Sequence, residues 1–261
     1  MLVGGNKRLR MALGVLETAN FLFVRALLKK PSAAKTLPGR FFRDYMSVVG
    51  TGRWQSRSPF EVFPTQSPIR VTIEHIAGEG IYTAIDELAM LAYITVATDP
   101  AKIFEIGTFR GRTALNFALN SAPECQVYTL DLPLWETDVQ GAYNSSDVKI
   151  VGASFPGSDY AGKSEAAKIV QLYGNSLRFD FSPYVGQMDL VFVDGAHHYE
   201  AAKSDTANAL RMIRPGGVVI WHDFANYGDY NDVTRAVLEA VPPAEVVQLE
   251  NTQLCCWRAP A

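Results

Sequence analysis

Glu105-Ile106-Gly107-Thr108-Phe109-Arg110-Gly111 is a glycine-bearing segment between a predicted strand and a predicted helix. Residues 102–106 form a short apolar run typical of a strand, and residues 112–120 have the apolar spacing of a helix. Gly107 allows a sharp turn after the strand, and Gly111 allows close approach at the start of the helix. Such a loop presents backbone N–H groups to a ligand, although on this segment alone a turn without a ligand is an equal alternative.

Outward from this loop, strand and helix patterns alternate along the chain. This alternation predicts an α/β fold with a doubly wound, mostly parallel, Rossmann-like sheet. A closing antiparallel hairpin around Glu250-Asn251 is expected at one edge. Further strands are expected at residues 126–130, 168–173, 189–193, 217–221, 245–249 and 253–257, and helices at 82–97, 201–213 and 233–241.

The domain organisation predicted is an N-terminal helix and irregular arm over residues 1–80 and one ligand-binding domain over residues 81–261. Residues 11–28 predict an amphipathic helix that packs on the domain, on a partner subunit or on a membrane surface, because polar residues interrupt the run too often for a membrane span. The proline-rich residues 31–70 predict an irregular arm with a short helix near 41–49. Two roles stay open for this arm, covering the active site or reaching another subunit of a homo-oligomer.

The connection over residues 132–167 is longer than a crossover with one helix requires. Long glycine-bearing loops in compact domains often carry binding function. A lid over the substrate and a plain surface insertion are both consistent with this stretch.

Composition narrows the function classes further. The chain has 261 residues, a net charge of −3 and three cysteines. The absence of a basic excess argues against nucleic acid as a partner, and no firm membrane association is expected. An odd number of cysteines without ligand spacing argues against a disulfide framework or a zinc site, so a reducing cytoplasm is the expected location.

Polar residues collect where the predicted parallel strands end. Asp131 ends the strand after the glycine loop, where an acidic residue is placed to accept hydrogen bonds from ribose hydroxyls. Three of the four histidines lie with two aspartates at the ends of the fourth and fifth strands. These five residues are Asp194, His197, His198, His222 and Asp223. Because ligands of open α/β sheets bind at the carboxyl ends of the strands, these residues are expected to converge.

The ordered segments resemble the class I S-adenosylmethionine-dependent methyltransferases over residues 80–240. Asp194-Gly195-Ala196-His197-His198-Tyr199 and Trp221-His222-Asp223-Phe224 resemble, more narrowly, the methyltransferase 24 group, which is similar to macrocin-type O-methyltransferases and cephalosporin-hydroxylase-like proteins. The segments that carry the wider resemblance are 105–111, Thr129-Leu130-Asp131, Gly174-Asn175-Ser176, 189–195 and Ile213-Arg214-Pro215-Gly216-Gly217.

The resemblance implies S-adenosylmethionine as the cofactor. Glu105 would anchor its amino-acid end, Asp131 would bind the ribose, and Asn175 with Ser176 would flank the adenine, with Asn in place of the more common Asp. The remaining cofactor-binding residues implied are Gly107, Thr108 and Gly111 of the loop and Asp194 at the methyl-transfer edge.

Methyl transfer to a hydroxyl oxygen requires removal of a proton. Histidine titrates near neutrality, so His198, with His222 as the second choice, is the predicted base, next to Asp194. Alternatively, Asp194 and Asp223 supply hard oxygen ligands for Mg²⁺, which would lower the pKa of the hydroxyl. Phe224 follows Asp223 where many related metal-dependent enzymes have Asn or Asp, and both mechanisms stay open.

The sequence therefore predicts a methyltransferase acting on an oxygen of a small hydroxylated molecule. A relative that binds the cofactor without transferring a methyl group is the alternative, because fold alone does not fix function. A nicotinamide-dependent oxidoreductase is disfavoured, because the Gly-x-Gly-x-x-Gly loop of dinucleotide binding is missing.

Overall fold

The computed structural model describes residues 54–76, 83–133, 155–225 and 231–261. Every described residue belongs to one compact unit, Gly50–Ala261. The predicted helices at 11–28 and near 41–49 lie outside the described residues. None of the helices in the described ranges combines the length and apolar character needed to cross a bilayer.

The described elements alternate largely as the sequence predicts. The strands are β1 Gln55–Arg57, β2 Lys102–Ile106, β3 Gln126–Asp131, β4 Ile169–Tyr173, β5 Met188–Val193, β6 Ile213–Trp221, β7 Val247–Leu249 and β8 Cys255–Arg258. The α-helices are α3 Pro59–Val62, α4 Ile85–Thr98, α5 Arg112–Leu119, α7 Tyr199–Met212 and α8 Asp232–Ala240, and short 3-10 helices cover η2 Ser164–Lys168 and η3 Ser182–Tyr184.

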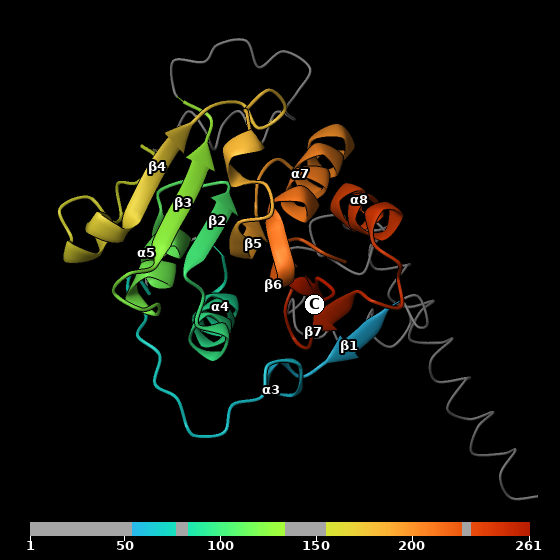
Figure 1. Cartoon of the computed structure of the whole chain (residues 1–261), viewed down its shortest axis with the longest axis horizontal. Coiled ribbons are helices and arrows are strands. Elements are labelled where there is room, and N and C mark those ends of the chain that lie inside the picture. Colours follow the sequence, from blue (N-terminus) through green and yellow to red (C-terminus); the bar gives the residue numbers. More distant parts are fainter. Residues whose placement is uncertain (1–53, 77–82, 134–154, 226–230) are drawn as a thin grey trace, which may run out of the picture. The chain divides into compact units, whose positions relative to one another are not determined.

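The strands form one sheet in the order β1-β7-β8-β6-β5-β2-β3-β4 (Figure 1). The pairs β3–β4, β2–β3, β2–β5, β5–β6 and β1–β7 are parallel, whereas β8 runs antiparallel to both β6 and β7. The turn between β7 and β8 contains Asn251 with a φ of +62°. The mostly parallel Rossmann-like sheet with a C-terminal antiparallel hairpin is thus confirmed.

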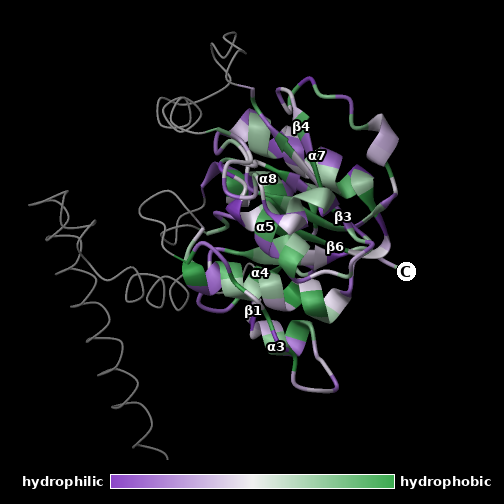
Figure 2. Ribbon diagram, turned by 90° about the vertical axis from the view of Figure 1, so that its left-hand side faces the viewer, coloured by the Kyte–Doolittle hydropathy of each residue, from purple (hydrophilic) through white to green (hydrophobic). Residues whose placement is uncertain are grey.

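Helices cover both faces of this sheet because the strand residues alternate between two apolar layers. Val191 and Val193 of β5 pack in one layer with α7 and α8, and Leu190 and Phe192 pack in the other with α4 and α5. Figure 2 shows hydrophobic colouring along most of α4, whose Leu88, Leu91 and Ile94 are buried. This period of two along central strands is the pattern of a sheet buried on both sides.

The irregular arm predicted for residues 31–70 differs from the structure, because its described part contains the short helix α3 and the strand β1. β1 pairs in parallel with β7 at the edge of the sheet. All three side chains of β1 are exposed. A strand of three exposed residues carries no alternation of apolar and polar side chains, so the sequence gives no signal for it.

The register of the central strands places the site. Ile106 of β2 lies opposite Leu130 of β3 and Val193 of β5, and Val193 lies opposite Trp221 of β6. The residues that follow these four positions therefore emerge side by side at one edge of the sheet. They are Gly107, Asp131, Asp194 and His222.

Candidate functional site

The glycine loop, residues 107–111, has a backbone that requires glycine at both ends. Gly107 has a φ of +103° and Gly111 a φ of +89°, a region that residues with a side chain rarely adopt. A Cβ at Gly107 would overlap the carbonyl oxygen of Asp194, and one at Gly111 would overlap the Tyr160 ring. Gly111 is the N-cap residue of α5. The first N–H groups of α5 therefore lie beside the loop, an arrangement that favours anionic or polar ligand groups.

Glu105 lies on β2 beneath this loop and is fully buried. Its Oε2 accepts a hydrogen bond from the Thr129 hydroxyl, whereas its Oε1 is buried with no hydrogen-bond partner among the described residues. Burial raises the pKa of Glu105 well above its ordinary value, and the charges of Asp194 and Asp131 add to the rise. A buried acceptor without a partner fits a ligand that brings a hydrogen-bond donor.

Asp131 closes the other side of the loop. Its Oδ2 accepts a hydrogen bond of 2.5 Å from the Phe109 amide, and its Oδ1 accepts one of 2.7 Å from the Leu132 amide. Burial raises the pKa of Asp131 to about 7, although both amides favour the ionised form. Each carboxylate oxygen can accept more than one hydrogen bond, so the predicted ribose contact is compatible with this geometry.

Three further residues predicted to bind the cofactor bond within the protein. The buried Thr108 hydroxyl lies 2.6 Å from that of Thr129. The Asn175 side chain accepts from the Leu177 amide, so it stabilises its own turn. Ser176 lies near Asp205 of α7, where burial raises the pKa of Asp205 to about 7 and Ser176 partly opposes the rise.

The two arginines of the loop region are engaged by protein groups. Arg110 donates from Nε to Asp159 over 3.1 Å. Arg112 is buried and donates to the carbonyl oxygens of His75 and Thr83. These residues position neighbouring segments against α5.

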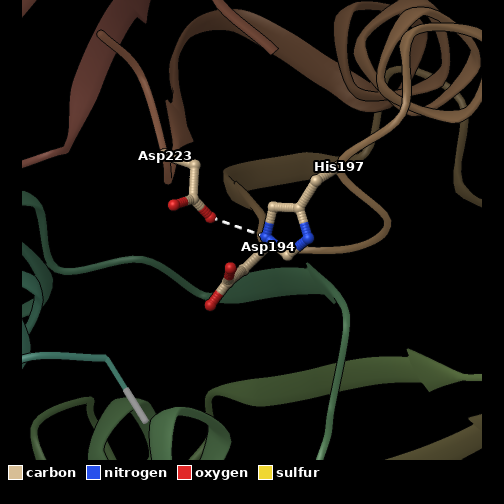
Figure 3. A group of neighbouring side chains, drawn as sticks. All are labelled: Asp194, His197 and Asp223. Atoms are coloured by element: carbon tan, nitrogen blue, oxygen red, sulfur yellow. Dashed lines mark hydrogen bonds and ion pairs between the residues drawn. The ribbon is translucent and has the colours of Figure 1, made fainter. Parts of the chain in front are cut away.

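The ends of β5 and β6 bring together the predicted aspartates and histidines. Asp194, His197 and Asp223 offer ligand atoms that all lie within 4.8 Å of one another. Figure 3 shows these three side chains directed toward one another, and His197 Nε2 lies 2.7 Å from Asp223 Oδ2. We call Asp194, His197, His222, Asp223 and Glu87 the Asp–His cluster, because His222 and Glu87 continue the same network.

His222 lies among three carboxylates at the centre of this cluster. Its Nδ1 is 2.9 Å from Asp223 and 3.3 Å from Asp194, and its Nε2 is 3.0 Å from Glu87. Burial alone would lower the pKa of His222, but the three carboxylates outweigh it and raise that pKa well above its ordinary value. The three carboxylates therefore favour the protonated form of His222, which is unsuited to accepting a further proton.

The pKa values of the carboxylates Asp223 and Glu87 shift in the opposite direction. Burial would raise the pKa of Asp223, yet the hydrogen bonds and charges of His197 and His222 outweigh it and hold that pKa well below its usual range. For Glu87 as well, the contacts with His222 outweigh burial and lower the pKa. Three carboxylates around one buried imidazolium leave an excess of negative charge at this edge of the sheet, which favours a cationic ligand.

The two neighbouring histidines differ in position. His197 reaches Asp223, and 41% of its side chain is exposed, against 13% for His222. His198 is the N-cap residue of α7, and its side chain does not cap that helix. His197 joins the Asp–His cluster through its hydrogen bond with Asp223 (Figure 3).

Glu87 was not among the site residues predicted from the sequence. This residue lies on α4, is 2% exposed, and also accepts a hydrogen bond of 2.6 Å from the Gln253 amide. It stands four positions before Leu91, on the buried face of its helix. A charged residue within an apolar helical stripe was the available signal, because such a residue is rarely buried without a partner.

Comparison with known proteins places this geometry in a family. Residues 104–224 match the family model of a methyltransferase domain, methyltransferase 24, a range that includes the glycine loop and the ends of β3, β5 and β6. Among curated protein sequences, none matches the chain.

Three solved methyltransferase structures are similar to this chain at low sequence identity. The O-methyltransferase TomG of Streptomyces achromogenes, involved in tomaymycin synthesis and solved with S-adenosylmethionine, is 16% identical with a TM-score of 0.49 over 69% of this chain and 83% of that chain. The Bacillus cereus O-methyltransferase with S-adenosylhomocysteine is 14% identical, with a TM-score of 0.45 over 70% and 84%. Methyltransferase PaMTH1 of Podospora anserina is 14% identical, with a TM-score of 0.48 over 69% and 80%.

The segment from β2 to the turn after β6 carries the Rossmann-like order of strands and the residues at their carboxyl ends. The match over residues 104–224 identifies this segment as a methyltransferase domain of the methyltransferase 24 group.

Proposed function

We propose that this protein is an S-adenosylmethionine-dependent methyltransferase that methylates an oxygen atom of a small hydroxylated molecule. The observation that carries the proposal is the juxtaposition of two sites at one sheet edge. The glycine loop with Glu105 and Asp131 lies beside the Asp–His cluster, because β2, β3, β5 and β6 end together. A cofactor held by the first site would present its methyl group to an acceptor held at the second.

The residues of the first site fit this cofactor. When bound, S-adenosylmethionine supplies an electrophilic methyl group on a sulfonium. The buried Oε1 of Glu105 is an acceptor suited to the ammonium group, directly or through water, and Asp131 is suited to the ribose hydroxyls. The excess negative charge of the Asp–His cluster favours the cationic sulfonium. Contacts of Asn175 and Ser176 with the adenine stay a prediction.

Within the second site, we assign the role of base to His197 in place of His198 and His222. His197 Nε2 lies 2.7 Å from Asp223 Oδ2, and in the tautomer in which Nε2 donates to this carboxylate, Nδ1 is the ring nitrogen that accepts the acceptor's proton. His222, which is already protonated between carboxylates, holds Asp194 and Asp223 in place. Because the single proton of the hydroxyl faces His197, Asp194 is left to accept a hydrogen bond from another donor group of the acceptor molecule.

A divalent metal ion is the second candidate for activating the hydroxyl. Asp194, His197 and Asp223 are close enough to share one ion. Two carboxylates with one imidazole suit Mn²⁺, Fe²⁺ or Zn²⁺ better than the Mg²⁺ expected from Asp194 and Asp223 alone. The ion would compete with the His222 imidazolium for both carboxylates, and this competition favours the base mechanism.

Calorimetry with S-adenosylmethionine tests the cofactor assignment. The protein should bind S-adenosylmethionine and not NAD, and Asp131→Asn should weaken binding by about tenfold or more, because a charged acceptor for the ribose is lost. Since the pKa of Asp131 is about 7, affinity should rise between pH 6 and pH 8 as the carboxylate ionises, and this rise should be absent in the variant. Failure of the wild type to bind S-adenosylmethionine would refute the proposal. Binding without transfer to any hydroxylated acceptor would instead support a non-methylating relative.

His197→Gln, compared with His198→Gln, separates the two histidines. We expect kcat to fall by roughly 10²- to 10³-fold for His197→Gln, because a general base is lost, with the affinity for S-adenosylmethionine unchanged. His198→Gln should have a much smaller effect on kcat. Equal losses in both variants would contradict the assignment to His197.

Treatment of the wild type with EDTA should leave activity intact, whereas loss on chelation and recovery with Mn²⁺ would establish the metal mechanism.

A further inference from the structure

The described end of the connection between β3 and β4 packs directly against the glycine loop. We call residues 155–163 the brace. The Asp159 amide donates a hydrogen bond of 2.8 Å to the Arg110 carbonyl, and the buried Asp159 carboxylate accepts one from Arg110 Nε. The brace therefore holds the loop through both the backbone and the side chain of Arg110.

Tyr160 is the centre of the brace. A Cβ added at Gly111 of the loop, or at Gly157 of the brace, would overlap atoms of the Tyr160 side chain. The phenol thus fills the space that both missing side chains leave open. The ring is largely buried, at 9% exposed, and it fixes the position of Gly111, where α5 begins.

The Tyr160 hydroxyl is linked through Gln171 to Thr108, at the other end of the loop. It donates to Gln171 Oε1 over 2.5 Å, and Gln171 Nε2 donates to the Thr108 hydroxyl over 3.0 Å. The Thr108 and Thr129 hydroxyls are 2.6 Å apart, and Thr129 donates to Glu105. A hydroxyl has one proton, so Thr108 must donate to Thr129 when Thr129 donates to ionised Glu105. Every hydrogen bond in this chain then points from Tyr160 toward Glu105.

We propose that Tyr160 is a positioning residue for the cofactor loop, acting on Gly111 through its ring and on Thr108 and Glu105 through its hydroxyl and Gln171. Cofactor affinity then depends on a side chain that acts through the loop, and the brace belongs to the cofactor site. This inference rests on the proposed function, because it takes the loop as the site of S-adenosylmethionine. It also gives the described end of the long connection a role other than that of a substrate lid.

The test compares Tyr160→Phe, Gln171→Leu and Tyr160→Leu with the control Tyr184→Leu. Tyr184 is also a partly buried tyrosine, but it packs on Phe104 and Tyr128 in the layer of α7 and α8. The dissociation constant for S-adenosylmethionine is measured by calorimetry, the midpoint of thermal unfolding by circular dichroism, and kcat at saturating cofactor.

The dissociation constant should rise about threefold to tenfold for Tyr160→Phe, which loses the hydrogen bond to Gln171, and at least as much for Gln171→Leu, which also loses the one to the Thr108 hydroxyl. Tyr160→Leu should raise it further, while kcat at saturation changes little. Tyr184→Leu should lower the unfolding midpoint but leave the dissociation constant within about twofold. Wild-type affinity in Tyr160→Phe and Gln171→Leu, both of which keep the packing, would overturn the inference while the proposed function stands. No binding by the wild type would overturn both.

Discussion

Gly107→Ala should destabilise the protein by at least ~3 kcal/mol and abolish binding of S-adenosylmethionine. The added Cβ would overlap the backbone carbonyl oxygen of Asp194, which cannot rotate away as a side chain could. The residue would also keep a φ of +103°, a conformation that costs alanine about 1–3 kcal/mol. Relief requires β2 to separate from the end of β5, and this movement would disrupt both halves of the site.

Gly162→Ala is the matched control for this substitution. Gly162 also has a positive φ, of +79°, but a Cβ there would meet no atom within 4 Å. It should therefore cost only the backbone strain, about 1 kcal/mol. Urea denaturation of both variants separates strain from overlap. Equal losses of stability would show that the close approach to Asp194 is relieved without cost.

His222→Leu should have the second largest effect, a loss of roughly 3–5 kcal/mol in the free energy of unfolding together with most of the activity. The substitution removes the imidazolium from among Glu87, Asp194 and Asp223 and leaves buried carboxylates without their cation. Arg214→Leu serves as the control, because it removes the cation of a pair with Asp189 in which the arginine side chain is 52% exposed. That variant should lose less than about 1 kcal/mol.

The pH dependence of this loss follows from the raised pKa of His222. The folded protein binds the proton more tightly than the unfolded chain does, so the stabilisation is complete below the unfolded pKa of about 6.5. It is lost as the pH rises through the folded pKa. The gap in stability between the wild type and His222→Leu should therefore narrow from pH 6.5 into the alkaline range. A gap that does not narrow over that range would show that His222 is neutral in the folded protein.

Glu87→Gln checks the same network from α4. The glutamine side chain keeps the shape of Glu87 but lacks the negative charge that faces His222 Nε2. It also offers the Gln253 backbone amide a weaker hydrogen-bond acceptor. A double-mutant cycle with His222→Leu should show strong coupling, because both substitutions break the same contact between Glu87 and His222. Additive losses would mean that the two residues act independently.

The features that could be predicted from the sequence are those encoded within short segments of the chain. Alternation of apolar residues with a period of two or 3.6 identifies the central strands and helices, because each element must bury its own face. Gly107 and Gly111 were recognisable because only glycine tolerates their backbone and the close approach of neighbours. Asp131, Asp194, His222 and Asp223 followed as well, since parallel strands end at one edge.

Contacts between side chains that are far apart in the sequence could be identified only from the tertiary structure. Glu87 reaches His222 from a helix outside the matched family range, and His197 forms a hydrogen bond with Asp223. Tyr160 lies against Gly111 at a distance in sequence that no local pattern spans. The strand β1 exists only because β7 offers it a partner. Such contacts depend on the order of the strands and on the paths of the connections, and neither leaves a periodic trace in the sequence around the residues concerned.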